Sequence, residues 1–264
     1  MDMLLFLVMV VLGLVGSFFS GLLGIGGAII NYPLLLYVPA LLGAAYFSAH
    51  EVSSISMFQV FFASLAGVIA FRNKSIKRSE SVVHKGLVLY MGSSILAGSL
   101  IGGFVSGMLK GDIINLIYGI LAVLAVVLML IPARGKEDQP AAELRFNKGV
   151  AIGSAFVVGI VSGIVGAGGA FILIPIMLTV LRIPTRTTIA SSLAIVFISA
   201  IGGVIGKLGG GGIPLWPTVF TVIGSLTGAP IGSKLSAKMN VKVLRYGLVV
   251  LIALTAVKVW SSIL

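Results

Sequence analysis

The chain has 264 residues, of which 58% are hydrophobic and only 9% are charged, and its mean hydropathy is +1.19. Because so few charged residues cannot cover a water-exposed surface, this composition excludes a soluble globular protein and predicts an all-α, polytopic membrane protein. The net charge of +11 comes with no basic patch interleaved with aromatic residues, which argues against nucleic acid as a partner, and the absence of cysteine excludes disulfides and thiolate metal sites.

The first apolar stretch covers about residues 3–44, whereas about 20 residues suffice to cross the hydrocarbon core of a bilayer as one helix. It carries three closely spaced glycines, Gly24, Gly26 and Gly27, followed by Pro33. Glycine adopts backbone conformations that end a helix, so we expect the stretch to fold as a hairpin of two segments. No basic residue and no obvious cleavage site precede the glycines, and we therefore expect the first helix to be retained rather than removed as a signal peptide.

Polar side chains occur after these glycines and in the next predicted segment, about residues 50–71. They are Asn31, Ser53, Ser54 and Gln59. Hydroxyl and amide groups can donate hydrogen bonds to a substrate anion without burying a charge. The alternative is structural, since serines can bond a carbonyl one turn earlier or join two helices, and Gln59 can pair with a neighbouring helix.

His50 and Glu51 form an adjacent titratable pair at the start of the same segment. Either side chain could carry a coupling proton, or the pair could cap the helix at the membrane surface. The corresponding positions of the second half of the chain are Thr188 and Ile189. The pair is therefore not part of a duplicated core.

Further spanning segments are predicted at about 86–107, 113–131, 187–206, 214–233 and 243–261. Two of them carry glycines four residues apart, Gly98 with Gly102 and Gly228 with Gly232. This spacing is typical of close helix packing, and we assign these glycines to packing rather than to binding.

The second long apolar stretch, about residues 149–181, repeats the glycine motif 142 residues after the first. Its glycines are Gly166, Gly168 and Gly169, and Pro175 follows them at the same distance as in the first copy. The motif thus predicts a second broken helix. Two discontinuous membrane helices in matching positions are typical of secondary transporters.

Other landmarks extend this internal repeat along the chain. The pair Ser53-Ser54 is matched by Ser191-Ser192. A long polar linker, residues 132–148, separates the two halves. We therefore predict a first transmembrane repeat over residues 1–131 and a second over 149–264.

The lysines and arginines predict the orientation, because cytoplasmic loops carry an excess of these residues. If each glycine stretch is a hairpin, the chain has ten segments, both termini lie outside, and 15 of the 18 basic residues fall inside, including those of the linker. Five segments per half is an odd number, so the two repeats are predicted to be inverted. The connection 207–212, which begins with Lys207, is expected to be an outside loop.

Inverted broken helices would bring the N-termini of two short helices together near the membrane midplane, where their free N–H groups favour an anion. Such a break is tolerated only beside protein or a water-filled cavity, so it marks a cavity. The predicted substrate-binding residues are Gly24, Gly26, Gly27, Asn31, Ser53, Ser54, Gly166, Gly168, Gly169, Ser191 and Ser192. No metal-ligating spacing and no nucleotide motif occurs, so no cofactor is expected.

The paired motif Gly-x-x-Gly-x-Gly-Gly, with a proline six residues beyond it in both halves, resembles that of the TauE/SafE family of membrane transporters. Members of that family are secondary transporters of small anions, notably sulfite and sulfonates. The resemblance covers essentially the whole chain and implies a multi-pass protein of a prokaryotic plasma membrane. The family commonly has a third glycine after the Gly-x-Gly-Gly run, where this chain has Ala28 and Ala170.

The favoured hypothesis is therefore a secondary-active transporter of a small anion, of the sulfite or sulfonate class, that works by alternating access. An anion channel or a transporter of a small carboxylate is the alternative that the same broken helices permit. An intramembrane enzyme would need paired ionisable side chains deep in the bilayer, and apart from Glu51 near one face the sequence offers none.

Overall fold

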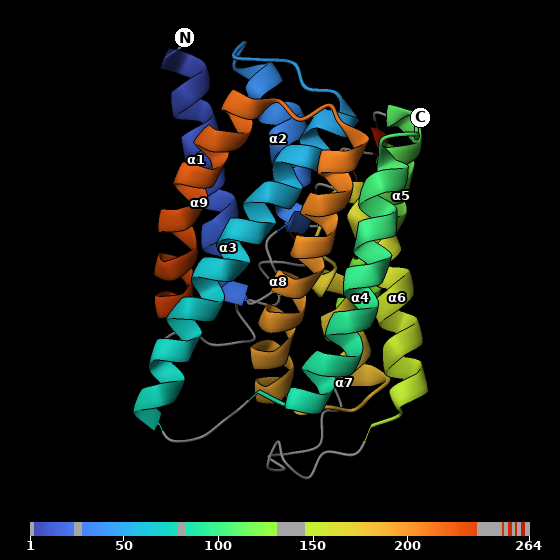
Figure 1. The fold of residues 1–264 in the computed structure, drawn as a ribbon. Helices are drawn as coiled ribbons and strands as arrows, with labels where there is room; N and C mark the ends of the chain where they lie inside the picture. The colour runs from blue at the N-terminus through green and yellow to red at the C-terminus, as the bar shows by residue number, and fades with distance from the viewer. Residues whose placement is uncertain are drawn as a thin grey trace.

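The computed structural model describes residues 3–23, 28–78, 83–130 and 146–236, together with 250, 253–254, 257 and 260–261. Over these residues the fold is all-α, as predicted (Figure 1). The helices are α1 (Met3–Leu23), α2 (Ala28–Leu41), α3 (Ala49–Arg78), α4 (Lys85–Ser106), α5 (Gly111–Leu130), α6 (Lys148–Val165), α7 (Ala170–Thr179), α8 (Thr185–Gly210) and α9 (Leu215–Ser236). The last predicted segment, about 243–261, lies largely outside the described residues.

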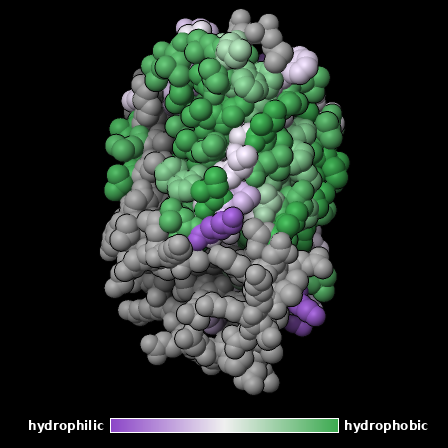
Figure 2. Space-filling model, turned by 90° about the vertical axis from the view of Figure 1, so that its left-hand side faces the viewer, coloured by the Kyte–Doolittle hydropathy of each residue, from purple (hydrophilic) through white to green (hydrophobic). Residues whose placement is uncertain are grey.

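Five helical stretches are long and apolar enough to cross a bilayer, and shorter apolar helices accompany them. The face formed by α1 and α9 is covered with hydrophobic side chains (Figure 2), among them exposed Leu7, Val11, Val219 and Ile223. An exposed apolar surface of this extent suits contact with lipid rather than with water. The protein is therefore a multi-pass membrane protein.

The two halves of the chain are interleaved rather than separate. Helix α1 packs along α9, and α4 packs against both α6 and α8. Glycines allow this close contact, because a Cβ atom at any of four of them would overlap a backbone carbonyl of the facing helix. These contacts are Gly98 with Phe156, Gly102 with Ile160, Gly228 with Leu14, and Gly232 with Phe18. The predicted packing role of these glycines is confirmed.

The helices that correspond to one another in the two predicted repeats run in opposite directions. Helix α1 runs antiparallel to α6, α3 antiparallel to α8, and α4 antiparallel to α9 (Figure 1). An inverted duplication requires these directions. The duplication itself, with its boundaries at residues 131 and 149, stays a prediction.

The two ends of the helical bundle differ in charge. At the end drawn at the bottom of Figure 1, α3 ends and α4, α6 and α8 begin. We call it the basic end because its chain segments contain Arg72, Lys74, Lys77, Arg78, Lys85, Lys148, Arg182 and Arg186. At the opposite end, where α3 and α5 begin and α8 ends, the α4–α5 turn contains Lys110. This separation agrees with the predicted sidedness.

Candidate functional site

The predicted break in the second half is present and is formed by glycine. Helix α6 ends at Val165, and the next glycines have positive φ angles: 79° at Gly166, 64° at Gly168 and 79° at Gly169. Other L-residues adopt this conformation only at a cost. Helix α7 then begins at Ala170, so the chain reverses inside the protein.

Hydroxyl groups of α3 satisfy the carbonyls that the break leaves free. Ser53 Oγ donates to the Ile164 carbonyl at 2.6 Å, and Ser56 Oγ donates to the Gly166 carbonyl at 2.9 Å. A Cβ atom at Gly166 would overlap the Ser53 carbonyl, so the backbones are in direct contact. Ser53 therefore has a structural partner here, and Ser56 is a neighbour of the break that the sequence analysis missed.

Lys207 corrects one prediction. It was expected in an outside loop, but α8 continues to Gly210 and buries it to 1% exposure. Its ammonium donates to Ser53 Oγ at 2.6 Å, to Ser106 Oγ at 2.5 Å and to the Ile164 carbonyl at 3.2 Å. The glycine run 209–212 suggested a loop, but two of those glycines belong to the last turn of the helix.

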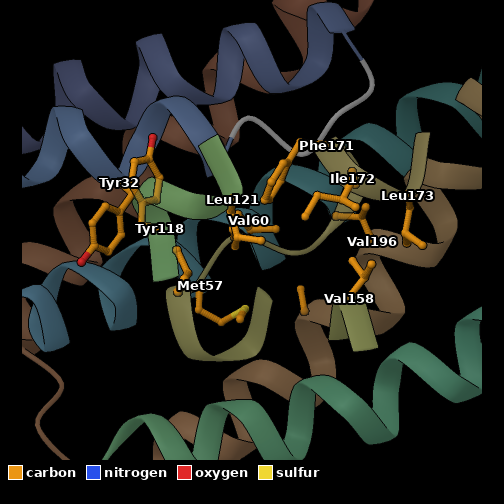
Figure 3. Close-up of a cluster of buried hydrophobic side chains, with 14 of the residues drawn as sticks. Tyr32, Met57, Val60, Tyr118, Leu121, Val158, Phe171, Ile172, Leu173 and Val196 are labelled. Atoms are coloured by element: carbon orange, nitrogen blue, oxygen red, sulfur yellow. The ribbon is translucent and has the colours of Figure 1, made fainter. Parts of the chain in front are cut away.

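The N-terminus of α7 faces aliphatic side chains. A Cβ atom at Gly168 would lie 2.6 Å from Val60 Cγ1 and 3.2 Å from Val196 Cγ1, and one at Gly169 would lie 2.9 Å from Val158 Cγ1. Figure 3 shows these valines within the buried hydrophobic cluster that also includes Phe171. Gly169 is the N-cap residue of α7 and has no side chain that could cap the helix. The second break is thus lined mainly by aliphatic side chains on the α7 side, with the Ser162 hydroxyl beside Gly169.

The first break lies between α1 and α2. Its predicted binding residues Gly24, Gly26 and Gly27 are outside the described residues. The two helices on either side are described: α1 ends at Leu23 and α2 begins at Ala28, running in the opposite direction (Figure 1). The side chains of the surrounding helices therefore show which groups lie near the first break.

Two buried amides lie beside the first break. Asn31, in the first turn of α2, is 2% exposed, and among the residues that the structure describes neither its Oδ1 nor its Nδ2 has a hydrogen-bond partner. Gln59 in α3 is buried and donates from Nε2 to the Gly13 carbonyl at 3.1 Å and to Ser17 Oγ at 3.5 Å, while its Oε1 has no partner within the described part of the chain. A Cβ atom at Gly16 would overlap Asn31 Oδ1 and lie 2.8 Å from Gln59 Nε2, so both amides face this glycine.

Unpaired buried amide atoms are uncommon, because an unsatisfied polar group costs about 1–3 kcal/mol. Three such atoms gathered between α1, α2 and α3 therefore indicate a place that a polar ligand or water fills. The predicted role of Asn31 remains a prediction that this geometry favours. Gln59, which the sequence analysis assigned to a structural bond, has that bond and one free acceptor as well.

The predicted serine residues do not meet in one site. Ser54 Oγ donates to the His50 carbonyl at 3.1 Å, one turn earlier in α3. Ser191 Oγ accepts from the His84 backbone N–H at 3.2 Å, near the basic end, where Ser192 is also buried. The pair in α3 begins near the opposite end, because α3 and α8 run in opposite directions.

In the titratable pair at the start of α3, Glu51 serves mainly to cap the helix through hydrogen bonds with Ser48. Glu51 Oε2 accepts from the Ser48 N–H at 2.8 Å and from Ser48 Oγ at 2.9 Å, and Ser48 Oγ accepts from the Glu51 N–H at 3.3 Å. This reciprocal arrangement is a capping box. His50 Nδ1 packs against Gly212, and no described residue hydrogen-bonds to its buried Nε2.

Comparison with known proteins adds the family. A family model described as Sulfite exporter TauE/SafE matches residues 9–259. The chain is 31% identical over 264 residues to a probable membrane transporter protein of Xylella fastidiosa, covering 95% of this chain and 93% of that protein. It is 25% identical over 253 residues to the probable membrane transporter protein YunE of Bacillus subtilis, covering 90% of each. No solved structure matches the chain.

Proposed function

Because the chain belongs to the TauE/SafE sulfite exporter family, which comprises membrane transporters and not enzymes, we propose that it is a secondary-active transporter of a small anion of the sulfite or sulfonate class. The proposed mechanism is alternating access at the two glycine breaks. The observation that carries the proposal is the pair of buried amides, Asn31 and Gln59, with three unpaired polar atoms beside the first break.

The chemistry of this site supports an anion. The Nδ2 group of Asn31 offers two N–H donors that have no partner among the described residues, and these donors suit an anion. The other two unpaired atoms, Asn31 Oδ1 and Gln59 Oε1, are acceptors, and Gln59 Nε2 already donates to the Gly13 carbonyl. Asn31 lies in the first turn of α2, where the partial positive charge of the helix also favours an anion by about 0.3–2 kcal/mol. The site has no basic side chain among these contacts, so binding should be weak, of about micromolar to millimolar order.

The second break supports movement rather than binding. Its glycines Gly166, Gly168 and Gly169 lie among valines and under the hydroxyls of α3, with little polar surface left for a ligand. A hinge of positive-φ glycines between α6 and α7 would allow the two helices to change their angle. Under this proposal the first break binds the anion and the second moves.

The proposal also assigns a side of the membrane to each end. We infer that the basic end, with the linker 132–148, is cytoplasmic. The chain has no native cysteine, so a single cysteine introduced at Gln139 reports its own position. Labelling of that cysteine by an impermeant thiol reagent added outside intact cells would contradict the orientation.

The test of function is flux into proteoliposomes containing the purified protein. We expect uptake of labelled sulfite or a small sulfonate, competition by the unlabelled anion, and counterflow when the vesicles are preloaded with it. Large ionic conductance without counterflow would instead identify a channel. Preferential uptake of small carboxylates would change the assigned substrate class from sulfite and sulfonates to carboxylates. Uptake of cations that sulfite and sulfonates do not affect would contradict the anion proposal.

A further inference from the structure

Lys207 is a buried charge that the proposed anion site does not use. Its side chain is 1% exposed, in a helix that crosses the membrane. Within the described residues its ammonium contacts only neutral oxygens, those of Ser53, Ser106 and Ile164, and no carboxylate lies within ion-pair distance. An ionisable residue inside a membrane bundle is costly to keep, so it usually serves a function.

The contacts of Lys207 fit only the protonated amine. An ammonium donates three hydrogen bonds, and three acceptors surround this one. The hydroxyl hydrogens of Ser53 and Ser106 are already donated to the carbonyls of Ile164 and Gly103, at 2.6 and 2.7 Å. A neutral amine would lose one donor and expose a lone pair that no neighbour is oriented to satisfy. Release of a proton must therefore rearrange the cluster.

The rearrangement would change the hydrogen bonds at the second break. Ile164 lies in the last turn of α6, just before the positive-φ Gly166, and Lys207 links its carbonyl to the last residue of α4 and the second turn of α3. These contacts join four helices around the hinge. The protonation state of one amine thus determines how firmly the end of α6 is held.

We propose that Lys207 is the proton-binding site that couples anion transport to a proton gradient. This inference depends on the proposed transport function and assigns its coupling ion. Anion and proton binding are expected to reinforce each other, because a negative charge in the bundle stabilises the ammonium and the effect is reciprocal. The cluster holds the hinge while Lys207 is protonated and releases it when the proton leaves.

At the end of the bundle where α3 begins and α8 ends, few other titratable groups of the described residues lie near Lys207. His50 in α3 interacts electrostatically with Lys207, and Glu51 beside it is held in the capping box with Ser48. The charged residues at the starts of α4 and α6, Lys85 and Lys148, lie at the basic end. His50 is therefore the competing candidate for the coupling proton, and the experiment includes it.

The experiment uses proteoliposomes with a pH-sensitive dye trapped inside and a small sulfonate as substrate. For the native protein we expect a sulfonate-dependent proton movement. A pH gradient of about one unit should drive about tenfold accumulation of the sulfonate for each coupled proton. Counterflow between equal pH values should not need the gradient.

Two variants of the lysine separate coupling from transport. Lys207→Met removes the titrating group, and Lys207→Arg keeps a charge that does not leave, since guanidinium stays protonated. Lys207→Met should lose the dye signal and the gradient-driven accumulation while keeping counterflow within a few-fold of the native rate. Lys207→Arg, whose charge keeps holding the hinge, should lose counterflow as well. Lys110→Met, which removes an exposed lysine from the α4–α5 turn, should keep all three.

Several results would overturn the inference. The first is gradient-driven accumulation by Lys207→Met or Lys207→Arg. The second is loss of coupling in His50→Gln while both lysine variants stay coupled. The third is a native protein that shows counterflow but whose transport does not respond to the pH gradient. Absence of counterflow in the native protein would instead reject the transport function itself. If Lys207→Met does not fold, Lys207→Arg and the dye signal of the native protein still decide the question.

Discussion

The two glycine breaks occupy matching places in the sequence but have different surroundings. At the repeat offsets, Asn31 of the first break corresponds to Leu173, and Gln59 corresponds to Phe197. The helices around the first break thus carry amides with atoms that have no partner among the described residues, whereas the second break lies among valines on its α7 side. Under the proposed function, the two copies of the glycine motif divide binding and movement between them because different side chains surround each copy.

The difference extends to how the helix ends are satisfied. At the second break Ser53, Ser56 and Lys207 supply donors to the carbonyls of Ile164 and Gly166. These donors pair the carbonyls of Ile164 and Gly166 and hold the end of α6. Between α1, α2 and α3, by contrast, Gln59 donates to the carbonyl of Gly13 in the middle of α1, and its Oε1 has no partner among the described residues. One region is closed by its own protein contacts, and the other has room in its hydrogen bonding for a ligand.

The largest effect is expected from filling the hinge of the second break. Gly168→Leu places a side chain at a positive φ of 64° and against Val60, so strain of about 1–2 kcal/mol adds to overpacking of about 1–3 kcal/mol. We expect transport to be abolished and the melting temperature of the purified protein to fall. Full counterflow by this variant would show that the second break need not move.

A large but more selective effect is expected from making the first break resemble the second. Asn31→Leu removes the unpaired amide, which should weaken sulfonate binding about two- to tenfold for each hydrogen bond lost. The same change should raise the melting temperature, because an unsatisfied buried amide costs about 1–3 kcal/mol. Opposite signs for binding and stability distinguish a ligand site from a structural residue.

The control for this prediction is a paired amide. Asn115 Oδ1 accepts from the Tyr32 hydroxyl at 2.9 Å, so Asn115→Leu should lower stability and leave binding unchanged. Asn31→Ala repeats the test without added volume. If Asn31→Leu lowers stability and binds sulfonate normally, Asn31 is a structural residue after all.

The smallest effects are expected from the serines of α3. Ser53→Ala leaves the Ile164 carbonyl with Lys207 as its remaining donor and removes one acceptor of the ammonium, so stability should fall by about 0.5–1.5 kcal/mol. Ser54→Ala removes only a bond to the His50 carbonyl within the same helix and should change little. Thermal melting of the two variants measures the difference. A larger loss of stability in Ser54→Ala than in Ser53→Ala would contradict this prediction.

Much of the architecture could be predicted because it depends on local sequence signals. The glycine motif marked the break between α6 and α7, and the glycines spaced by four marked contacts between helices. Both follow from what the absence of a Cβ atom allows. The segment lengths followed from the thickness of the bilayer.

The chemistry of the breaks could not be predicted, because it depends on which helices meet. Asn31 and Gln59 come from two helices, and only the fold shows that their amides meet beside Gly16 of a third helix and keep atoms without partners among the described residues. Lys207 was assigned to a loop because glycines follow it, although the helix continues through two of them. The binding role of Ser191 stays a prediction, and no signal in the sequence indicated that its hydroxyl accepts a hydrogen bond from the His84 backbone.

The central claim is that the anion binds at the first break and not at the second, and protection of single cysteines tests it most directly. Ser17 lies beside Gln59 at the first break, and Ser162 lies beside Gly169 at the second, both buried. The labelling rates of Ser17→Cys and Ser162→Cys with a small thiol reagent would be measured with and without a saturating sulfonate. We predict that the sulfonate slows labelling of Ser17→Cys and leaves Ser162→Cys unchanged, whereas protection of Ser162→Cys alone would contradict the assignment.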